Sequence, residues 1–305
     1  MENSPIAVCG LGQMGLPVAA RLAGGFDVTA FDLNADRRRL AATVDRIETT
    51  DDLTRLADCN RIVLSLPAPA VSRSVIAELT PHLSAGTVVV ETSTVLPGDV
   101  RGSAALLAAA GASLIDAAIL SGVVQMESGT ATLLVGGSAS DIERVADVLS
   151  VLGGAGWSRF GDLGSGMAAK VVNNAVAHAV MVVLVEAFAM AQAEGLDLAD
   201  IATMFERPDG GLIRPLTHRI CERVATGAFE GGMPLNAARK DSTLALAMAQ
   251  ASGVPLFATQ ACQSVYDLAV AAGSPRDDYA AIARLWESWT GSTLTFDVTQ
   301  PRDER

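Results

Sequence analysis

The chain of 305 residues is short of positive charge and of cysteine. Its 34 acidic residues outnumber its 22 basic ones, which gives a formal net charge of −12. Such a surface repels phosphate backbones, so nucleic acid is not an expected partner. The four cysteines lie far apart in sequence, which excludes the CxxC spacing of redox and zinc motifs, and we expect no metal. Unpaired thiols of this kind are typical of a reducing cytosol.

The chain also lacks the pattern of a signal peptide and a clean membrane span. The first residues, MENSPIAV, contain no basic segment followed by a separate apolar one. The most hydrophobic stretch, residues 174–192, carries His178 and Glu186 near its middle, and no basic flank follows it. We therefore expect a cytoplasmic protein without a membrane partner, in which this stretch is a buried helix.

Short strand-like and helix-like segments alternate through the first half of the chain. Strand patterns occur at residues 6–11, 27–33, 61–67, 86–94, 112–120 and 131–137, and helical runs separate most of them. This alternation predicts a parallel sheet with helices on both faces, a Rossmann-type α/β domain over residues 1–163. The strand signal then nearly disappears. Residues 164–305 are predicted to form an all-α domain that opens with a long interdomain helix.

A glycine-rich turn follows the first predicted strand directly. Gly10, Gly12 and Gly15 fit G-x-G-x-x-G between a strand and a helix, which is the setting that this motif requires. The first glycine permits a tight turn, the second lets the backbone approach a pyrophosphate, and the third lets helix and strand pack closely. The helix N-terminus attracts anions. The expected cofactor contacts in this turn are Gly10, Leu11, Gly12, Gln13, Met14 and Gly15.

An acidic residue ends the second predicted strand, twenty positions after Gly12. This residue, Asp32, is expected to accept hydrogen bonds from the ribose hydroxyls of the adenosine, whereas a 2′-phosphate would meet its negative charge. NAD is therefore expected rather than NADP, with Leu33 and Asn34 as further contacts. The arginines at 37–39 favour a solvated helix face. FAD and S-adenosylmethionine proteins use the same turn.

One lysine lies inside the apolar long helix. Lys170 precedes Asn174 by four residues, so the two side chains share a helix face. A lysine in apolar surroundings is unfavourable unless it is paired or functional. The helix dipole near the N-terminus also lowers the pKa of an ammonium. Lys170 is thus a candidate general acid or base. The alternative is a structural lysine whose aliphatic side chain packs on apolar surface while its ammonium reaches solvent.

Four blocks of sequence together resemble one known family. They are GLGQMGLPVA (10–19), DAAILSGVVQMESGTATLLVGG (116–137), GSGMAAKVVNN (164–174) and KDSTLALAMAQASGVPLF (240–257). In them the chain resembles the β-hydroxyacid dehydrogenases, the family of 3-hydroxyisobutyrate dehydrogenase and tartronate semialdehyde reductase. The 6-phosphogluconate dehydrogenases are distant relatives. The resemblance implies hydride transfer between NAD(H) and a small β-hydroxy acid, or its semialdehyde or keto form.

The resemblance also implies roles for individual residues. Lys170 falls on the catalytic lysine that moves the proton of the substrate hydroxyl or carbonyl, and Asn174 falls on the amide that orients the substrate. Ser121 and Gly122 fall on the loop that holds the substrate carboxylate. Lys240 falls on a second lysine, which closes on both cofactor and substrate.

Three further residues fall on the cofactor side of the family's site. Thr94 matches a hydroxyl residue beside the cofactor, and Leu66 and Pro67 follow a strand at its adenosine-ribose side. One block departs from the family pattern. The loop DAPVSGG is replaced by DAAILSGV, with one residue that appears extra before Ser121 and Val123 in place of the last glycine.

Two alternatives to a dehydrogenase stay open. An imine reductase shares the fold but usually prefers NADP and usually lacks the catalytic lysine. A nucleotide-binding scaffold without catalysis is the other alternative. In each case the apolar long helix predicts a homodimer or homotetramer that associates through the helical domain.

Overall fold

The computed structural model describes residues 5–273 and 275–298 and contains two compact units. The first unit is Met1–Ala175 and the second is Val176–Arg305. The predicted boundary at 163/164 lies one residue before the start of the long helix α8 (Ser165–Ala193), whereas the two units divide within that helix.

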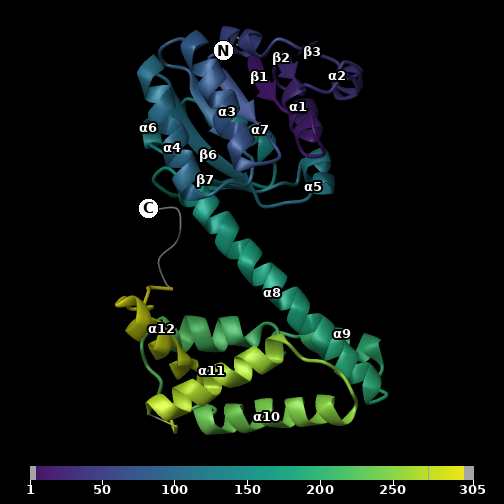
Figure 1. The fold of residues 1–305 in the computed structure, drawn as a ribbon, viewed down its shortest axis with the longest axis vertical. Helices are drawn as coiled ribbons and strands as arrows, with labels where there is room; N and C mark the ends of the chain where they lie inside the picture. Colours follow the sequence, from purple (N-terminus) through teal and green to yellow (C-terminus); the bar gives the residue numbers. More distant parts are fainter. Residues whose placement is uncertain (1–4, 274, 299–305) are drawn as a thin grey trace. The chain divides into compact units, whose positions relative to one another are not determined.

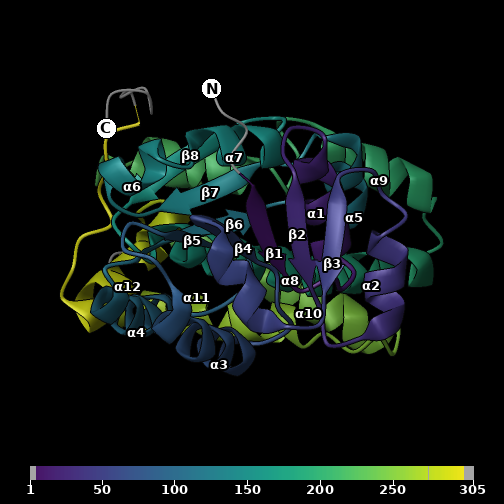
Figure 2. The same cartoon turned by 90° about the horizontal axis from the view of Figure 1, so that it is seen from above.

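The first unit is built on a single sheet of eight strands (Figures 1 and 2). The strand order is β3-β2-β1-β4-β5-β6-β7-β8. β2 and β3 therefore extend the sheet on one side of β1, and β4 to β8 extend it on the other, so the order reverses between β1 and β4. In chain order the strands are β1 (Ile6–Cys9), β2 (Val28–Phe31), β3 (Ile47–Thr50), β4 (Arg61–Leu64), β5 (Val88–Glu91), β6 (Ser113–Ile119), β7 (Leu133–Gly136) and β8 (Trp157–Gly161).

Helices cover both faces of this sheet, as the alternation of patterns predicted. The α-helices of the unit are α1 (Gly15–Ala23), α2 (Ala35–Ala41), α3 (Pro69–Leu79), α4 (Pro97–Leu107), α5 (Val123–Ser128), α6 (Ala139–Glu143) and α7 (Ala146–Leu152). Short 3-10 turns, η1 (Leu53–Asp58), η2 (Thr80–His82) and η3 (Ala108–Ala110), complete the connections. Figure 2 shows α3 and α4 on one side of the strands, with α1 and α7 on the other.

Side chains of alternating strand residues form two separate cores. Val8 and Val90 pack with α1, α5 and α7, whereas Cys9 and Val89 pack with α3 and α4. This alternation is the period-2 geometry of a strand that is buried on both faces. It also places each polar residue at a strand end on a defined face, which matters for the site below.

The expectation of a wholly parallel sheet is wrong at one pair. β6 and β7 run antiparallel, with Asp116 paired to Gly136, and the other neighbouring strands are parallel. The connection between β6 and β7 contains only the six-residue helix α5, and it returns the chain at the same end of the sheet. The edge strands β3 and β8 were not predicted from the sequence. Their polar or glycine-containing segments, IETT and WSRFG, carry weak strand signals.

The second unit is helical, as predicted. It contains most of α8, then α9 (Leu198–Glu206), η4 (Pro215–Val224, a π-helix), α10 (Leu235–Ala251), α11 (Ala258–Ala272), η5 (Tyr279–Ile282) and α12 (Ala283–Thr290). A small apolar core around Val224 and Phe229 lies beside the buried carboxylate of Asp278. Arg219 and Arg223 pair with that carboxylate at N···O distances of 3.0 and 3.4 Å.

A buried carboxylate anchors the first turn of α8. The Asp116 carboxylate on β6 accepts hydrogen bonds from the backbone N–H groups of Gly164 and Met167, both at 2.7 Å. It therefore satisfies donors that a helix start leaves unpaired. A Cβ on Gly166 would lie 2.9 Å from an Asp116 oxygen and 2.3 Å from the carbonyl of Leu134, so the helix start packs directly on the sheet.

A second carboxylate explains the acidic residue inside the apolar part of α8. Glu186 is buried, and its oxygens accept hydrogen bonds from the N–H groups of Phe257, Ala258 and Thr259 and from the Thr259 hydroxyl. Desolvation raises the pKa of Glu186, but these hydrogen bonds outweigh it and lower the pKa below its usual range. Glu186 thus stabilises the N-terminus of α11 as an anion.

Most of α8 is not buried within the single chain, which contradicts the expectation of a buried helix. By length and composition α8 could span a membrane, and only 11% of its most apolar window is buried. The exposed apolar side chains include Val172, Val176, Met181 and Val185, each more than half exposed. An apolar surface of this length requires another apolar surface or a lipid environment to cover it.

Candidate functional site

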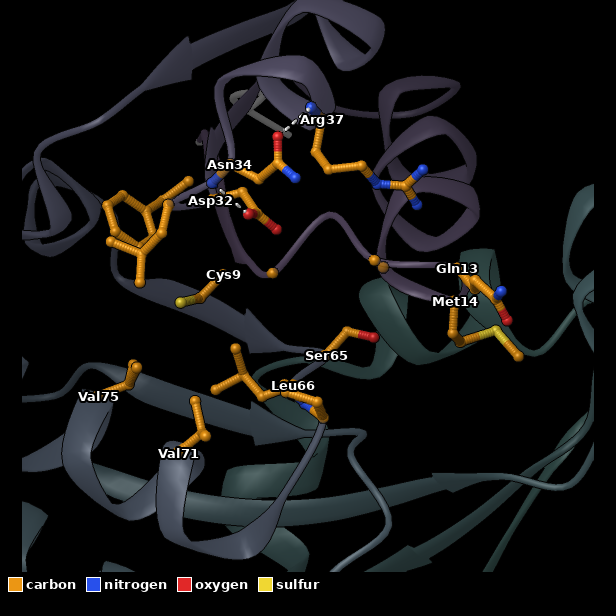
Figure 3. A pocket seen from close by; sticks show the side chains of 16 residues that line it. Cys9, Gln13, Met14, Asp32, Asn34, Arg37, Ser65, Leu66, Val71 and Val75 are labelled. Carbon is orange, nitrogen blue, oxygen red and sulfur yellow. Dashed lines mark hydrogen bonds between the residues drawn. The ribbon is translucent and has the colours of Figure 1, made fainter.

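A cavity of the first unit lies where β1 and β4 end. These strands are neighbours at the point where the strand order reverses, which is where open α/β sheets bind ligands. The cavity encloses about 750 Å³. Ten residues predicted as cofactor contacts line it (Figure 3): Gly10, Gly12, Gln13, Met14, Gly15, Asp32, Leu33, Asn34, Leu66 and Pro67.

The glycine turn has the backbone geometry that its motif predicts. Gly10 adopts a φ of +97°, and a Cβ there would lie 2.3 Å from the carbonyl oxygen of Ser65. A Cβ on Gly15 would lie 2.0 Å from the carbonyl oxygen of Gly10. Around Gly12, by contrast, no atom of the described residues other than its chain neighbours lies within 4 Å of an added Cβ. Gly10 and Gly15 are therefore required for packing, whereas Gly12 leaves open space at the cavity.

The N-terminus of α1 faces this turn without a side-chain cap. No side chain accepts a hydrogen bond from its first N–H groups, and its first turn contains no acidic residue. The N–H of Leu16 is bonded to the carbonyl of Gly12, and Pro17 has no N–H, so the helix dipole is what makes this end suited to an anion such as a pyrophosphate. The Cys9 thiol, which also lines the cavity, is neutral, because burial raises its pKa to about 12.

Asp32 is held rigidly at the cavity by backbone donors. One carboxylate oxygen accepts a hydrogen bond from the N–H of Leu11 at 2.7 Å, and the other accepts one from the N–H of Asn34 at 2.8 Å. Each oxygen retains a lone pair for a ligand hydroxyl. Leu11 itself is buried and does not line the cavity, so its part is to fix Asp32.

The arginines after Asp32 do not form the solvated face that the sequence favoured. The Arg37 side chain lines the cavity, and its Nε donates to the carbonyl of Leu11 at 2.6 Å. Arg38 donates to the carbonyl of Asp32 at 2.6 Å. Only Arg39 fits the expectation, because it is exposed and pairs with Asp36 on the same helix. Arg37 is thus a cavity residue that sequence reasoning missed.

The opposite wall of the cavity consists of the loop after β4 and the first turns of α3. Ser65, Leu66 and Pro67 belong to the loop, and Val71 and Val75 project from α3 (Figure 3). The two valines are four residues apart and share a helix face. Their spacing was visible in the sequence, but nothing in it indicated which face of α3 meets a ligand.

Lys170 and Asn174 lie in the first turns of α8, in the same unit as the cavity but outside its lining. Both side chains are partly exposed. Burial lowers the pKa of the Lys170 ammonium below its ordinary value. The chain contains two lysines in all, Lys170 and Lys240. Lys240 belongs to the second unit, where its side chain is exposed. Its Nζ forms an ion pair with Oδ1 of Asp241 at 3.0 Å.

The loop predicted to hold a carboxylate is partly occupied by its own side chains. Gln125, which sequence reasoning did not single out, accepts a hydrogen bond from the N–H of Gly122 at 3.1 Å. The Ser121 oxygen accepts one from the N–H of Thr132 at 3.2 Å, which leaves the serine hydroxyl free to donate. Thr94 is exposed. Two buried residues, Thr92 and Ser93, separate it from the end of β5.

Comparisons with known proteins identify the family. Residues 5–161 match the model of the NAD binding domain of 6-phosphogluconate dehydrogenase, and residues 164–286 match the model of the NAD-binding of NADP-dependent 3-hydroxyisobutyrate dehydrogenase. The 2-(hydroxymethyl)glutarate dehydrogenase of Eubacterium barkeri is 31% identical over 97% of this chain and 99% of its own length. The chain is a member of the β-hydroxyacid dehydrogenase family. This dehydrogenase is therefore an NAD(P)-dependent oxidoreductase of hydroxy acids.

Solved structures agree with the fold of this dehydrogenase. The 3-hydroxyisobutyrate dehydrogenase of Mycobacterium tuberculosis, solved with L-serine, has a TM-score of 0.65 at 26% identity and covers 92% of this chain and 99% of its own. An imine reductase variant from Myxococcus stipitatus, solved with NAD+, has a TM-score of 0.83 at 23% identity and covers 94% of this chain and all of its own. At this identity, the similarity to the imine reductase shows a shared fold and says nothing of a shared activity.

The contrast between Gly10 and Gly12 gives a test of the cavity of this dehydrogenase. Gly12→Ala is expected to fold normally, since its Cβ meets no atom, but to weaken NADH binding by about tenfold or more by displacing the pyrophosphate. Gly10→Ala is expected to destabilise the protein by about 3 kcal/mol or more through backbone strain and the clash with Ser65. Thermal unfolding and NADH fluorescence titration check both. Normal NADH affinity in Gly12→Ala would contradict this placement of the cofactor.

Proposed function

We propose that this protein oxidises a small β-hydroxy acid with NAD+, or reduces the corresponding semialdehyde, and that Lys170 is its general acid and base. The observation that carries the proposal is the environment of Lys170. It follows the Asp116-anchored first turn of α8, it shares a helix face with Asn174, and burial lowers its pKa. A lowered pKa increases the fraction of neutral amine that can accept a proton at a given pH.

In the proposed reaction the cavity residues bind the cofactor and the residues of α8 act on the substrate. The α1 N-terminus and the Gly10–Gly15 turn would bind the pyrophosphate, and Asp32 would accept from the ribose hydroxyls. Bound nicotinamide would supply the hydride chemistry. Neutral Lys170 would take the proton of the substrate hydroxyl during oxidation and would return it during reduction. Asn174, the Ser121 hydroxyl, Gly122 and Lys240 would orient the substrate and its carboxylate, with Thr94 beside the cofactor.

The names of two relatives, and the L-serine in the solved structure of one of them, suggest a common substrate class. 3-Hydroxyisobutyrate, L-serine and 2-(hydroxymethyl)glutarate each carry a hydroxymethyl group on the carbon that bears the carboxylate. They differ in the third substituent, which is a methyl, an ammonium or a carboxyethyl group. We therefore propose a 3-hydroxypropionate with a substituent at its second carbon as the substrate, with the semialdehyde as product.

The assay for this function uses these three acids with NAD+ and follows the absorbance of NADH. Lys170→Ala is expected to lower kcat by about 10²- to 10⁴-fold, because the proton acceptor is lost, and to leave the Kd for NADH within about twofold. Lys170→Arg is the matched variant, since it keeps the positive charge but cannot lose its proton. Unchanged turnover in either variant would refute the role of Lys170.

A failure of the wild-type protein would have a different meaning. If it bound NADH but oxidised none of the three acids, the substrate class would be wrong and an imine reductase or a non-catalytic scaffold would be favoured. Reduction of a cyclic imine with NADH or NADPH would then separate those two.

We further propose that NAD is preferred over NADP. The Asp32 carboxylate at the ribose side of the cavity supports this preference, as does the apolar side chain of Leu33, which is 87% exposed beside it. Arg37 is a cation on the same lining, but its Nε is already bonded to Leu11. The first matching family model is described by NAD binding, and the second by an NADP-dependent dehydrogenase.

The expected kcat/KM with NAD+ exceeds that with NADP+ by about tenfold or more, because the 2′-phosphate would lie against the Asp32 carboxylate. Asp32→Asn should narrow this ratio, since it removes the charge and keeps an acceptor oxygen. Arg37→Ala is the companion variant. A wild-type preference for NADP that disappears in Arg37→Ala would show that Arg37 binds the phosphate and would overturn the use of Asp32.

The exposed apolar surface of α8 supports a homo-oligomer formed through this helix and the helical unit that it opens. We propose a dimer or tetramer of a cytoplasmic, water-soluble enzyme, in which a second copy covers Val172, Val176, Met181 and Val185. Light scattering at micromolar concentration should show at least two copies. Met181→Glu should shift the protein toward monomer, and Leu40→Glu, an exposed leucine on α2, is the matched control. A wild-type monomer, or sedimentation with membranes, would contradict this proposal.

A further inference from the structure

A buried polar cluster lies directly behind the β4 side of the cofactor cavity. Its members are Ser72 on α3, Glu91 at the end of β5, and Ser93 two residues later, and each is at most 5% exposed. None of them lines the cavity or belongs to the substrate residues above. Burying a carboxylate costs free energy of folding unless hydrogen bonds compensate it. The contacts of Glu91 show what this burial achieves.

Strand alternation determines which face carries this cluster. Leu64, Glu91 and Asp116 are register partners on β4, β5 and β6. Leu64 packs on the face that α3 and α4 cover, and the register places Glu91 and Asp116 on that face as well. Ser72 reaches the cluster from α3, the helix that also presents Val71 and Val75 to the cavity.

The hydrogen bonds of the cluster join two loops. Glu91 Oε1 accepts from the N–H of Ser93 at 2.9 Å, and Ser93 Oγ accepts from the N–H of Leu66 at 2.8 Å. The Thr92 hydroxyl donates to the carbonyl of Leu64 at 2.6 Å beside them. The loop after β5 is thereby tied to the loop after β4, which provides Ser65, Leu66 and Pro67 to the cavity lining.

We propose that Glu91 and Ser93 are positioning residues for the cofactor, because they fix the Ser65–Pro67 wall of the cavity from behind. The chain of contacts runs from the Glu91 carboxylate through the Ser93 backbone and hydroxyl to the Leu66 N–H. The proposal rests on the assignment of the cavity to NAD(H), and it adds two residues that touch neither cofactor nor substrate.

The charge of Glu91 makes this arrangement sensitive to pH. Burial raises the pKa of Glu91 to about 7, hydrogen bonds from Ser93 and Ser72 oppose the rise, and the nearby Asp116 adds to it. The facing titratable groups are Asp116 on β6 and Cys9 on β1. The Cys9 thiol lines the cavity, and the Glu91 charge contributes to its raised pKa, so that charge acts at the cavity wall.

The sign of the pH effect follows from the charge of the ligand. As pH rises through about 7, Glu91 loses its proton and places a negative charge behind the wall. NADH carries a negative pyrophosphate, so its affinity should fall as pH rises from 6 to 8. By linkage, NADH binding should raise the pKa of Glu91.

Three variants test the proposal by NADH fluorescence titration between pH 6 and pH 8. Ser93→Ala removes the acceptor of the Leu66 N–H, and it should weaken NADH binding by about three- to tenfold. Its kcat at saturating cofactor should stay within about twofold of the wild-type value. Ser103→Ala is the matched control, since Ser103 is an equally buried serine on α4, and its NADH affinity should equal that of the wild type.

Glu91→Gln keeps an acceptor for the Ser93 N–H and removes the titration. Wild-type NADH affinity should fall about threefold or more between pH 6 and pH 8, and that of Glu91→Gln should stay flat. Equal NADH affinity in Ser93→Ala and Ser103→Ala, or a wild-type pH dependence in Glu91→Gln, would overturn the proposal. If Ser93→Ala does not fold, the Glu91→Gln comparison decides. A wild-type protein that binds no NADH would instead refute the proposed function itself.

Discussion

The site depends on one backbone contact, between the turn after β1 and the end of β4. Gly10 lies so close to the Ser65 carbonyl that any Cβ would overlap it, and Gly15 lies equally close to Gly10. These contacts bring the N-terminus of α1 to the point where the strand order reverses. The N-terminus of α1, the Asp32 carboxylate and the Leu66–Pro67 wall then surround one cavity. The cofactor site is therefore a consequence of how closely two strands and one helix pack.

Buried carboxylates provide the second layer of organisation. Asp116 binds N–H groups at the start of α8, Glu186 binds N–H groups at the start of α11, and Glu91 binds the loop after β5. Each sits where a helix or loop leaves backbone donors unpaired, so its burial is offset by hydrogen bonds. The acidic residues that look out of place in apolar segments of the sequence are the ones that hold the functional elements in position.

Local patterns were sufficient to predict the glycine turn and the position of Asp32 beside it, whereas the role of Lys170 stays a prediction. The strand, the turn and the helix follow one another along the chain, so their pattern is visible locally, although the Ser65 carbonyl that Gly10 meets comes from a distant segment. Arg37, Gln125 and the valines of α3 were missed, because their roles depend on which helix face meets the cavity. The antiparallel direction of β7 was missed because it is set by the connection through α5. The residues of a strand do not themselves indicate whether it runs parallel or antiparallel to its neighbour. The exposure of α8 was also missed, since an apolar helix pattern does not reveal which chain covers it.

The central claim is that Lys170 exchanges the proton of the reaction, and its own titration tests this most directly. Because the chain contains two lysines, trace labelling with an amine reagent across pH, read by peptide mass spectrometry, follows Lys170 alone. Lys170 is expected to titrate with a midpoint below the ordinary lysine value of about 10.4. The kcat for oxidation of the hydroxy acid is also expected to rise with pH through the pKa of Lys170 in the ternary complex. A Lys170 that titrates as a free lysine, with a kcat that does not follow its protonation, would contradict this claim.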